Sequence, residues 1–198
     1  MPSDVAGLVL AAGSGSRYGG PKALVEYEGS RLVDRAVRLL SAGGCDPVFV
    51  VSGAVPLSVA GAIVVHNPGW ATGMGSSLRA GLRALSWSAA DAVVVALVDQ
   101  PWVGAEAVTR LRAAWASGSV SVAVATYDGR RGNPVLLSRS VWPEVAALAE
   151  GDVGARPFMT AHRDLITAVD CTGTGLPADV DTPADLEHPA LPRRVRDG

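Results

Sequence analysis

Short apolar runs alternate with segments of helical periodicity along most of the chain. Four of these runs, at residues 7–10, 47–51, 63–65 and 92–97, are continuously apolar and rich in valine. Strands that are buried on both faces have this pattern, whereas strands with one solvated face alternate apolar and polar residues. We therefore expect these four segments to be buried strands of a parallel sheet.

The segments between the runs predict helices. Apolar residues recur at helical spacing over 32–40, and the pattern stops at the glycine pair 43–44. Ser76 and Ser77 are expected to cap a second helix, and a third is expected over 105–115. This alternation of strands and helices predicts a three-layer α/β/α sandwich, Rossmann-like, with a mostly parallel sheet.

The pattern changes in the last third of the chain. A turn at residues 128–129 is followed by a strand-like stretch at 135–137 and by a helix that begins near Trp142. No linker of useful length separates these pieces from the preceding part. We expect a single domain over 1–198, in which about 127–190 forms a lobe added to the C-terminal side of the sheet.

Composition and charge exclude several classes of protein. The chain has 198 residues and a formal net charge of −2. Its arginines are scattered, whereas a surface that binds nucleic acid normally shows clustered basic residues. Cys45 and Cys171 lack the CxxC spacing of a metal site, and we expect them to be reduced thiols packed as small apolar side chains.

Nothing in the sequence favours a membrane or secreted location. The N-terminal stretch MPSD carries an acidic residue where a secretory signal needs positive charge, and the longest apolar run, 92–98, is too short to span a bilayer. We expect a cytoplasmic protein with no membrane and no nucleic-acid partner.

The loop after the first predicted strand, AAGSGSRYGGPK, has the composition of an anion site. Open parallel sheets bind ligands beyond the carboxyl ends of their strands. A dinucleotide fingerprint would need glycine at Tyr18, and the phosphate loop of NTPases would need lysine at Pro21. What remains is a loop of backbone N–H groups with two fixed positive charges, Arg17 and Lys22, which suit a triphosphate. Solvated loop charges are the plain alternative, and the position directly after a buried strand disfavours it.

Two aspartates are candidate ligands for the magnesium ion that triphosphate chemistry requires. Asp99 ends an apolar strand, where a buried charge is costly without a partner. Asp181 precedes Thr182 and Pro183, which open a short helix, and the local pattern favours a simple helix cap at least as much as a metal ligand. Asp179 is the weaker candidate.

A second glycine-rich stretch, NPGWATGMGSSLRAGL, lies before a predicted helix. Its glycines allow close approach of a ligand to the backbone, and amides at the helix start can hydrogen-bond a base or ribose. Trp70 and Trp102 are expected in loops at the edge of this site, where an aromatic ring can stack on a substrate or close the pocket.

These motifs together resemble the MobA-like nucleotidyltransferases, whose signature is LAAGxSxRMGxxK. Arg17 and Lys22 fall on the arginine and lysine of the signature, while Tyr18 replaces the usual methionine. The motifs DQP and DVDTPxDL carry the metal-binding aspartates of that family and map to Asp99 and Asp181. The resemblance implies a GT-A-like nucleotidyltransferase fold and Mg²⁺ as cofactor, with Mn²⁺ as a substitute.

Within the family the chain is most similar to the molybdenum cofactor cytidylyltransferases, the MocA type. The likeness lies in LAAG, GMGSSLRAGL, VDQP, GNPVLLSR around Asn133, GDVGAR at 151–156, and DVDTP. It implies transfer of CMP from CTP to the terminal phosphate of molybdopterin, with release of pyrophosphate. Ala12 in place of glycine narrows the base pocket, which is consistent with a pyrimidine.

The resemblance also implies a role for each matching residue. About 1–126 would bind the nucleotide and about 127–190 the acceptor, and the product would pass on in a transient contact with a molybdoenzyme. The implied catalytic residues are Arg17 and Lys22, the nucleotide-binding residues are Leu10, Ala11, Ala12, Gly13, Ser14, Gly15, Gly73 and Ser77, the metal ligands are Asp99 and Asp181, and the acceptor-binding residues are Asn133 and Arg156.

Several alternatives stay open. The donor can be GTP, as in a molybdenum cofactor guanylyltransferase, or the acceptor can be methylerythritol phosphate or a sugar phosphate. The protein can also be a nucleotide-binding module without turnover, or a scaffold that uses its tryptophans to bind a partner. The joint presence of Arg17, Lys22, Asp99 and Asp181 argues against a degenerate site.

Overall fold

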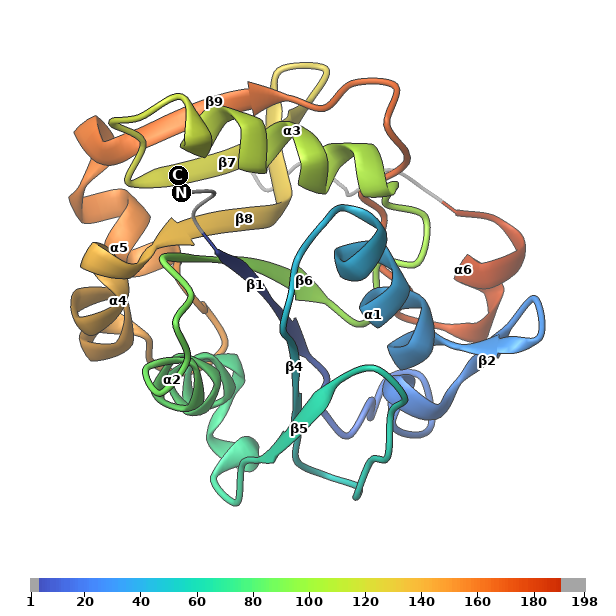
Figure 1. The fold of residues 1–198 in the computed structure, drawn as a ribbon. Helices are drawn as coiled ribbons and strands as arrows, with labels where there is room; N and C mark the ends of the chain where they lie inside the picture. Colours follow the sequence, from blue (N-terminus) through green and yellow to red (C-terminus); the bar gives the residue numbers. More distant parts are fainter. Residues whose placement is uncertain (1–3, 190–198) are drawn as a thin grey trace.

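A mostly parallel sheet with helices on both faces forms the centre of the molecule (Figure 1). The computed structural model describes residues 4–189, so the first three residues of the MPSD stretch and the end of the predicted 1–198 domain lie outside it. Within 4–189 the sheet has seven strands in the order β5-β4-β1-β6-β8-β7-β9. The strands are β1 (Val5–Leu10), β4 (Val48–Ser52), β5 (Ile63–His66), β6 (Ala92–Leu97), β7 (Val122–Tyr127), β8 (Arg130–Ser138) and β9 (Ile166–Asp170).

β8 is the reversed strand of this sheet. It runs antiparallel to its neighbours β6 and β7, and the other neighbouring pairs are parallel. The turn predicted at residues 128–129 joins β7 to β8, with Asp128 at φ 50° and Gly129 at φ 75°. The mostly parallel sheet predicted from the sequence is confirmed.

The helices form two layers on opposite faces of the sheet (Figure 1). α1 (Leu32–Ala42) and α3 (Ala105–Ala116) pack on one face, and α2 (Met74–Leu85), α4 (Trp142–Leu148) and α5 (Arg156–Ala161) pack on the other. Cys45 and Cys171 lie buried as free thiols in the first layer, as predicted. Among the described residues, none of the helices combines the length and apolar character of a membrane span.

Shorter elements complete the chain. They are the hairpin β2 (Glu26–Tyr27) and β3 (Ser30–Arg31), the 3-10 turns η1 (Lys22–Leu24), η2 (Trp70–Thr72), η3 (Arg139–Val141) and η4 (Arg163–Leu165), and the helix α6 (Pro183–Glu187). The sequence pattern indicated α6 but did not predict β2, β3, α5 or β9. β9 has an exposed or half-buried pattern along its length, which gives no run of buried apolar residues to detect.

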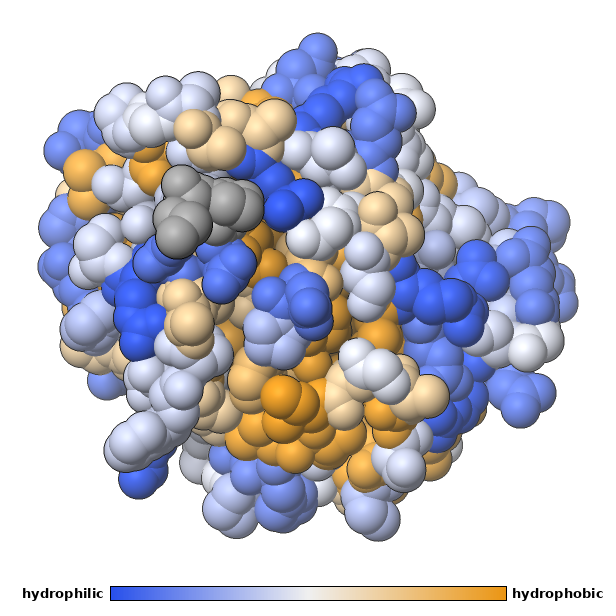
Figure 2. Space-filling view, in the orientation of Figure 1, coloured by the Kyte–Doolittle hydropathy of each residue, from blue (hydrophilic) through white to orange (hydrophobic). Residues whose placement is uncertain are grey.

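Two predictions about individual elements were wrong. The run at 63–65 forms β5, but β5 is an edge strand, and Ile63 is 51% exposed. Figure 2 shows apolar residues gathered at the surface over β5, between α1 and α2. The second helix begins at Met74 with Gly73 as its N-cap, so Ser76 and Ser77 lie inside its first turn and do not cap it.

The sheet places the loops of the candidate site together. β1 and β6 are parallel neighbours, with Leu10 opposite Leu97, so the loops that follow them leave the same edge. The return segment joins them there, because the Val180 amide donates a hydrogen bond of 2.8 Å to the Asp99 carbonyl. Segments about 80 residues apart in sequence therefore meet at one end of the sheet.

Candidate active site

A cleft of about 630 Å³ opens at the carboxyl edge of the sheet. The first loop, the start of α2, the end of β6 and the return segment before α6 all contribute to it. Its lining residues are Leu10, Ala12, Gly13, Ser14, Gly15, Ser16, Arg17, Lys22, Trp70, Ala71, Gly73, Met74, Ser77, Leu97, Val98, Asp99, Asp152 and Asp181. Of the residues predicted to bind the nucleotide, to act in catalysis or to bind the metal, only Ala11 is missing from this lining. The side chain of Ala11 is buried in the core.

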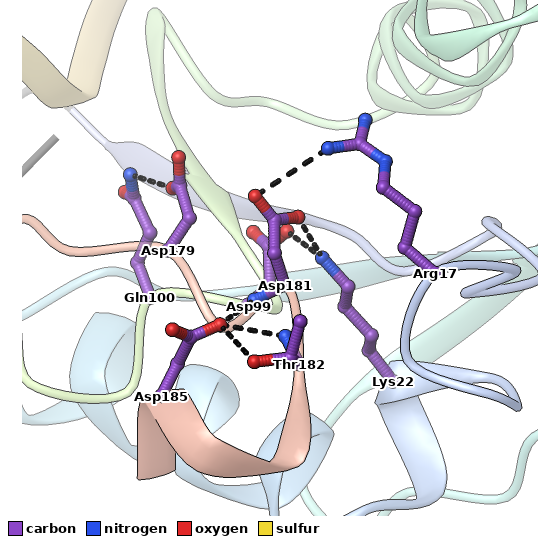
Figure 3. A network of polar contacts seen from close by, with 8 residues as sticks. All are labelled: Arg17, Lys22, Asp99, Gln100, Asp179, Asp181, Thr182 and Asp185. Carbon is purple, nitrogen blue, oxygen red and sulfur yellow. Dashed lines mark hydrogen bonds and ion pairs between the residues drawn. The ribbon is translucent and has the colours of Figure 1, made fainter. Parts of the chain in front are cut away.

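The centre of the cleft is an ion-pair cluster around Lys22 (Figure 3). The Lys22 Nζ lies 2.9 Å from Oδ2 of Asp99 and 3.0 Å from Oδ1 of Asp181. Arg17 approaches the same aspartate from the other side, with 3.5 Å between its guanidinium and Oδ2 of Asp181. The four residues named for catalysis and metal binding thus meet in space, although 159 positions separate Lys22 from Asp181.

The two cations differ in how firmly they are held. The Lys22 side chain is 15% exposed and that of Arg17 is 80% exposed. Burial lowers the pKa of Lys22, but the adjacent carboxylates of Asp99 and Asp181 outweigh this effect, and the net pKa is raised. Lys22 is therefore a positive charge held in place at neutral pH, whereas the Arg17 guanidinium is largely exposed to solvent.

The first loop folds around one of its own carbonyl groups. The Gly15 carbonyl accepts hydrogen bonds from the amides of Tyr18, Gly19 and Gly20. Gly15 has φ +62°, and a Cβ there would lie 1.9 Å from the Gly20 carbonyl oxygen, so the turn requires glycine. Within the described part of the chain, the amides at 13–17 have no backbone acceptor, so this half of the loop is the part that can bind phosphate.

A buried asparagine organises the start of α2. Asn67 is 5% exposed, and its Nδ2 donates to the hydroxyls of Ser76 and Ser77 at 2.9 and 3.1 Å. Its Oδ1 accepts from the Gly69 amide at 3.0 Å. Asn67 therefore holds Ser77, which lines the cleft, in place. The sequence pattern gave no reason to select Asn67, because its role depends on these contacts.

A capping box fixes the backbone of Asp181. Thr182 is the N-cap of α6, and Asp185 Oδ2 accepts hydrogen bonds from the Thr182 amide at 2.6 Å and the Asp181 amide at 2.9 Å. These bonds lower the pKa of the Asp185 carboxyl. The cap that the local sequence indicated is made by Thr182 and Asp185, which leaves the Asp181 carboxylate to face Lys22 (Figure 3).

The third aspartate of this region has a different partner. Asp179 Oδ1 accepts a hydrogen bond of 2.7 Å from the side chain of Gln100, to one side of the Lys22 cluster (Figure 3). The structure therefore pairs Asp99 and Asp181 around one cation and directs Asp179 to a neighbouring amide.

The residues proposed to bind the acceptor lie outside the cleft lining. Asn133 is half-buried on β8 beside Leu97 and Gln100, and its carbonyl accepts from the Tyr127 hydroxyl at 2.9 Å. Arg156 is exposed at the first position of α5. The structure does not bring Asn133 and Arg156 together with the ion-pair cluster.

Trp70 and Trp102, which were both expected at the edge of the site, have different surroundings. Trp70 lines the cleft. The Trp102 indole donates to the Tyr27 hydroxyl at 3.2 Å and packs edge-on against that ring, with 5.9 Å between centroids. Trp102 therefore fastens the β2–β3 hairpin to the loop after β6.

The donor set of the cluster fits a divalent cation. One oxygen each of Asp99 and Asp181 lies within about 3 Å of the Lys22 nitrogen, so both oxygens face a common point. Magnesium is usually held by one or two carboxylates together with water and substrate phosphates. Within residues 4–189, no group of three or more acidic, histidine or cysteine side chains is arranged as a metal site by itself.

Comparisons with known proteins find a matching family model and similar relatives. The model of the MobA-like NTP transferase domain matches residues 7–165. The chain is 38% identical to the nicotine blue oxidoreductase of Paenarthrobacter nicotinovorans, with 90% of this chain and 92% of that protein covered. It is 31% identical to a molybdenum cofactor guanylyltransferase of Cereibacter sphaeroides, with 79% and 81% covered.

The fold is also similar to solved structures. Rv0371c of Mycobacterium tuberculosis H37Rv matches with a TM-score of 0.79 at 27% identity, with 94% of this chain and 97% of that chain covered. A structure of Rv0371c in complex with manganese matches with a TM-score of 0.73 at 25% identity, with 93% and 97% covered.

Proposed function

Because the chain belongs to the MobA-like NTP transferase family and has its Rossmann-like nucleotidyltransferase fold, we propose that it transfers CMP from CTP to the terminal phosphate of molybdopterin. The observation that carries this proposal is the convergence of Lys22, Asp99 and Asp181 beside the glycine-rich loop. It supplies a fixed cation and a pair of oxygen ligands next to a phosphate-binding backbone, which are the groups that phosphoryl chemistry uses.

The reaction is a displacement at the α-phosphorus of CTP. An oxygen of the acceptor phosphate forms the new bond to that phosphorus, and the bond to the bridging oxygen breaks, so pyrophosphate leaves with the electron pair. An acceptor phosphate is largely ionised near neutral pH, and the step therefore needs no general base. Lys22 and Arg17 neutralise the negative charge that develops on the phosphates.

We assign a divalent cation, Mg²⁺ with Mn²⁺ as a substitute, to the carboxylates of Asp99 and Asp181. When bound, it would supply charge neutralisation on the phosphate oxygens. The facing oxygens of the two aspartates support this assignment, as does the manganese complex of Rv0371c. With the cation bound to the aspartates, Lys22 would be released to bind phosphate.

CTP is the proposed donor because the wall of the proposed base pocket carries an alanine, which leaves less space than glycine would. Ala12 lines the cleft, and its methyl group takes space that glycine would leave free. GTP remains the second candidate, because relatives at 31% identity are named guanylyltransferases. We further propose that the part of the single domain over about 127–190, with Asn133 and Arg156, faces the acceptor.

Hydride transfer is the rival suggested by the name of the relative from Paenarthrobacter. In a dinucleotide-binding unit the helix begins directly after the first glycine-rich turn, so that its N-terminus faces the pyrophosphate. Here β1 ends at Leu10 and α1 begins at Leu32, and the segment between them carries Arg17 and Lys22 into the cleft. This geometry favours a triphosphate over a nicotinamide dinucleotide.

Pyrophosphate release tests the proposal. The protein is incubated with Mg²⁺ and each of the four nucleoside triphosphates, with and without molybdopterin. Release only with CTP and molybdopterin is expected, and a preference for GTP would move the protein to the guanylyltransferases. Binding of CTP without release would redirect the search to another phosphorylated acceptor, such as methylerythritol phosphate or a sugar phosphate, or to a binding role.

A further inference from the structure

Asp152 places a carboxylate in the wall of the cleft, apart from the ion-pair cluster. It lines the cleft together with Trp70, Met74 and Ser77. Oδ1 of Asp152 accepts a hydrogen bond of 3.3 Å from the Met74 amide, in the first turn of α2. No hydrogen bond to Oδ2 is found among residues 4–189, so this oxygen can accept one from a ligand.

The loop that carries Asp152 is fixed to α2. The Gly151 carbonyl accepts from the Gly75 amide at 2.7 Å, and the Ala149 carbonyl accepts from the Arg79 guanidinium. Gly73 lies directly against this loop, because a Cβ there would be 2.4 Å from the Gly151 backbone and 2.7 Å from Asp152 Oδ1. The backbone of this loop is therefore held in position before a ligand arrives, and the exposed Asp152 side chain is joined to α2 by its bond to the Met74 amide.

The charge of Asp152 defines what can lie beside it. A phosphate would be repelled, and phosphates already have Arg17, Lys22 and the loop amides at the other wall. A carboxylate accepts hydrogen bonds only, so its ligand must donate them. The Trp70 ring and the Met74 thioether, which line the same cleft, suit the face of a flat aromatic ring.

We infer that Asp152 is a specificity-determining residue that accepts a hydrogen bond from an amino-substituted heteroaromatic ring of a substrate. The inference rests on the proposed function, in which both the donor and the acceptor carry such a ring: the 4-amino group of cytosine and the 2-amino group of the pterin. A site built to accept from an amino group rejects an analogue that presents an oxygen there. Uracil differs from cytosine in this way.

The variant Asp152→Asn tests the inference with little change in shape. Its amide oxygen can still accept from the Met74 amide, so the start of α2 keeps its bond, while its amide nitrogen turns a donor toward the ring. The matched control is Glu150→Gln, which removes one charge from an exposed position on the same loop, outside the cleft lining.

Two measurements identify the ring. The first is the affinity of each protein for CTP and for UTP with Mg²⁺ and no acceptor, by calorimetry. The ratio of CTP to UTP affinity should fall about tenfold or more in Asp152→Asn, as expected for loss of a hydrogen bond to a charged group, and should not change in Glu150→Gln. The second is the KM for molybdopterin at saturating CTP.

The two measurements together decide whether Asp152 accepts from a ring and which ring it is. A lower affinity ratio supports the inference with the nucleobase as the ring, and an unchanged ratio with a raised KM for molybdopterin supports it with the pterin as the ring. If both are unchanged in Asp152→Asn, the inference is overturned and Asp152 only caps α2. If the unaltered protein neither binds nor turns over CTP or GTP, the proposed function fails instead.

Discussion

Lys22 is the only lysine of the chain, and it lies where two negative charges meet. An ammonium that bridges two carboxylates can exchange places with a divalent cation, because both satisfy the same oxygens. The raised pKa of Lys22 keeps it charged while it bridges the two carboxylates. Under the proposed function, Lys22 would then neutralise phosphate.

Replacing Lys22 by Ala tests this role. We expect kcat/KM to fall by about 10²–10³-fold, the range for loss of one group that stabilises transition-state charge. The melting temperature should also fall, because the variant leaves the facing carboxylates of Asp99 and Asp181 without their cation. Pyrophosphate release and thermal unfolding measure the two effects, with Arg83→Ala on the exposed face of α2 as a control. An unimpaired rate in Lys22→Ala would remove the lysine from the mechanism.

Replacing Asp99 by Asn tests the metal assignment. The amide keeps the shape of the side chain and loses the charge that a divalent cation needs. Metal-dependent binding of CTP should be lost, as measured by calorimetry with and without Mn²⁺. Asp179→Asn is the matched control, since Asp179 bonds to Gln100 and not to Lys22. Equal loss in the two variants would show that general negative charge, and not a ligand at Asp99, attracts the cation.

The start of α2 and the loop at 149–152 form one structural unit. Gly73 has φ +109° and meets the Gly151 backbone, so the two segments can approach only because residue 73 lacks a side chain. Asn67 holds the same turn in place through its hydrogen bonds to the hydroxyls of Ser76 and Ser77. The start of α2 and this loop thereby form one wall of the cleft, to which Gly73, Met74, Ser77 and Asp152 contribute.

Gly73→Ala should loosen this unit. Gly118→Ala is the matched control, because Gly118 also has a positive φ, +87°, but faces open space. The control should lose about 1–2 kcal/mol from the left-handed backbone alone. Gly73→Ala should lose more and should also bind CTP more weakly, as measured by urea unfolding and calorimetry. Equal stability and affinity in the two variants would show that the contact between the segments contributes nothing.

The cap of α6 makes a pH-dependent contribution to stability. The Thr182 amide, its hydroxyl and the Asp181 amide lower the pKa of Asp185 in the folded state. A lowered pKa gives stability that is complete above the unfolded-state value, about 4, and is lost as the pH falls through the folded-state value. The bonds therefore stabilise the protein at neutral pH and not in acid.

Asp185→Ala should accordingly be less stable than the unaltered protein at pH 7. The difference should shrink as the pH falls from about 4 through the lowered folded-state pKa, where the carboxyl of the unaltered protein becomes protonated. Urea unfolding across this range measures the difference, with the exposed Glu187→Ala on the same helix as a control. A difference that is independent of pH would mean that packing, and not the charged cap, stabilises α6.

Continuous apolar runs were enough to predict the strands at the centre of the sheet and its parallel character. The same pattern failed for β5, because an edge strand can be apolar and still exposed. The pattern also did not predict β9, whose side chains are exposed or half-buried. Sheet position depends on long-range pairing, which local periodicity does not encode.

Site residues that belong to a sequence motif could be predicted. Those whose position depends on packing between distant segments could not. Arg17, Lys22, Asp99 and Asp181 were named from loop composition and resemblance, and the structure brings them together. Asp152 lines the cleft without having been predicted, since its position depends on packing between a loop and α2. The likeness in GDVGAR at 151–156 was the one signal that pointed to this segment.

The proposed reaction breaks the bond between the α- and β-phosphates of CTP. The most direct test follows the label from [α-³²P]CTP and from [γ-³²P]CTP in parallel reactions with Mg²⁺ and molybdopterin. We predict that the α-label moves to the pterin product while the γ-label appears in pyrophosphate. Release of the γ-label as inorganic phosphate, or retention of both labels in CTP while a nicotinamide cofactor is oxidised, would contradict the claim.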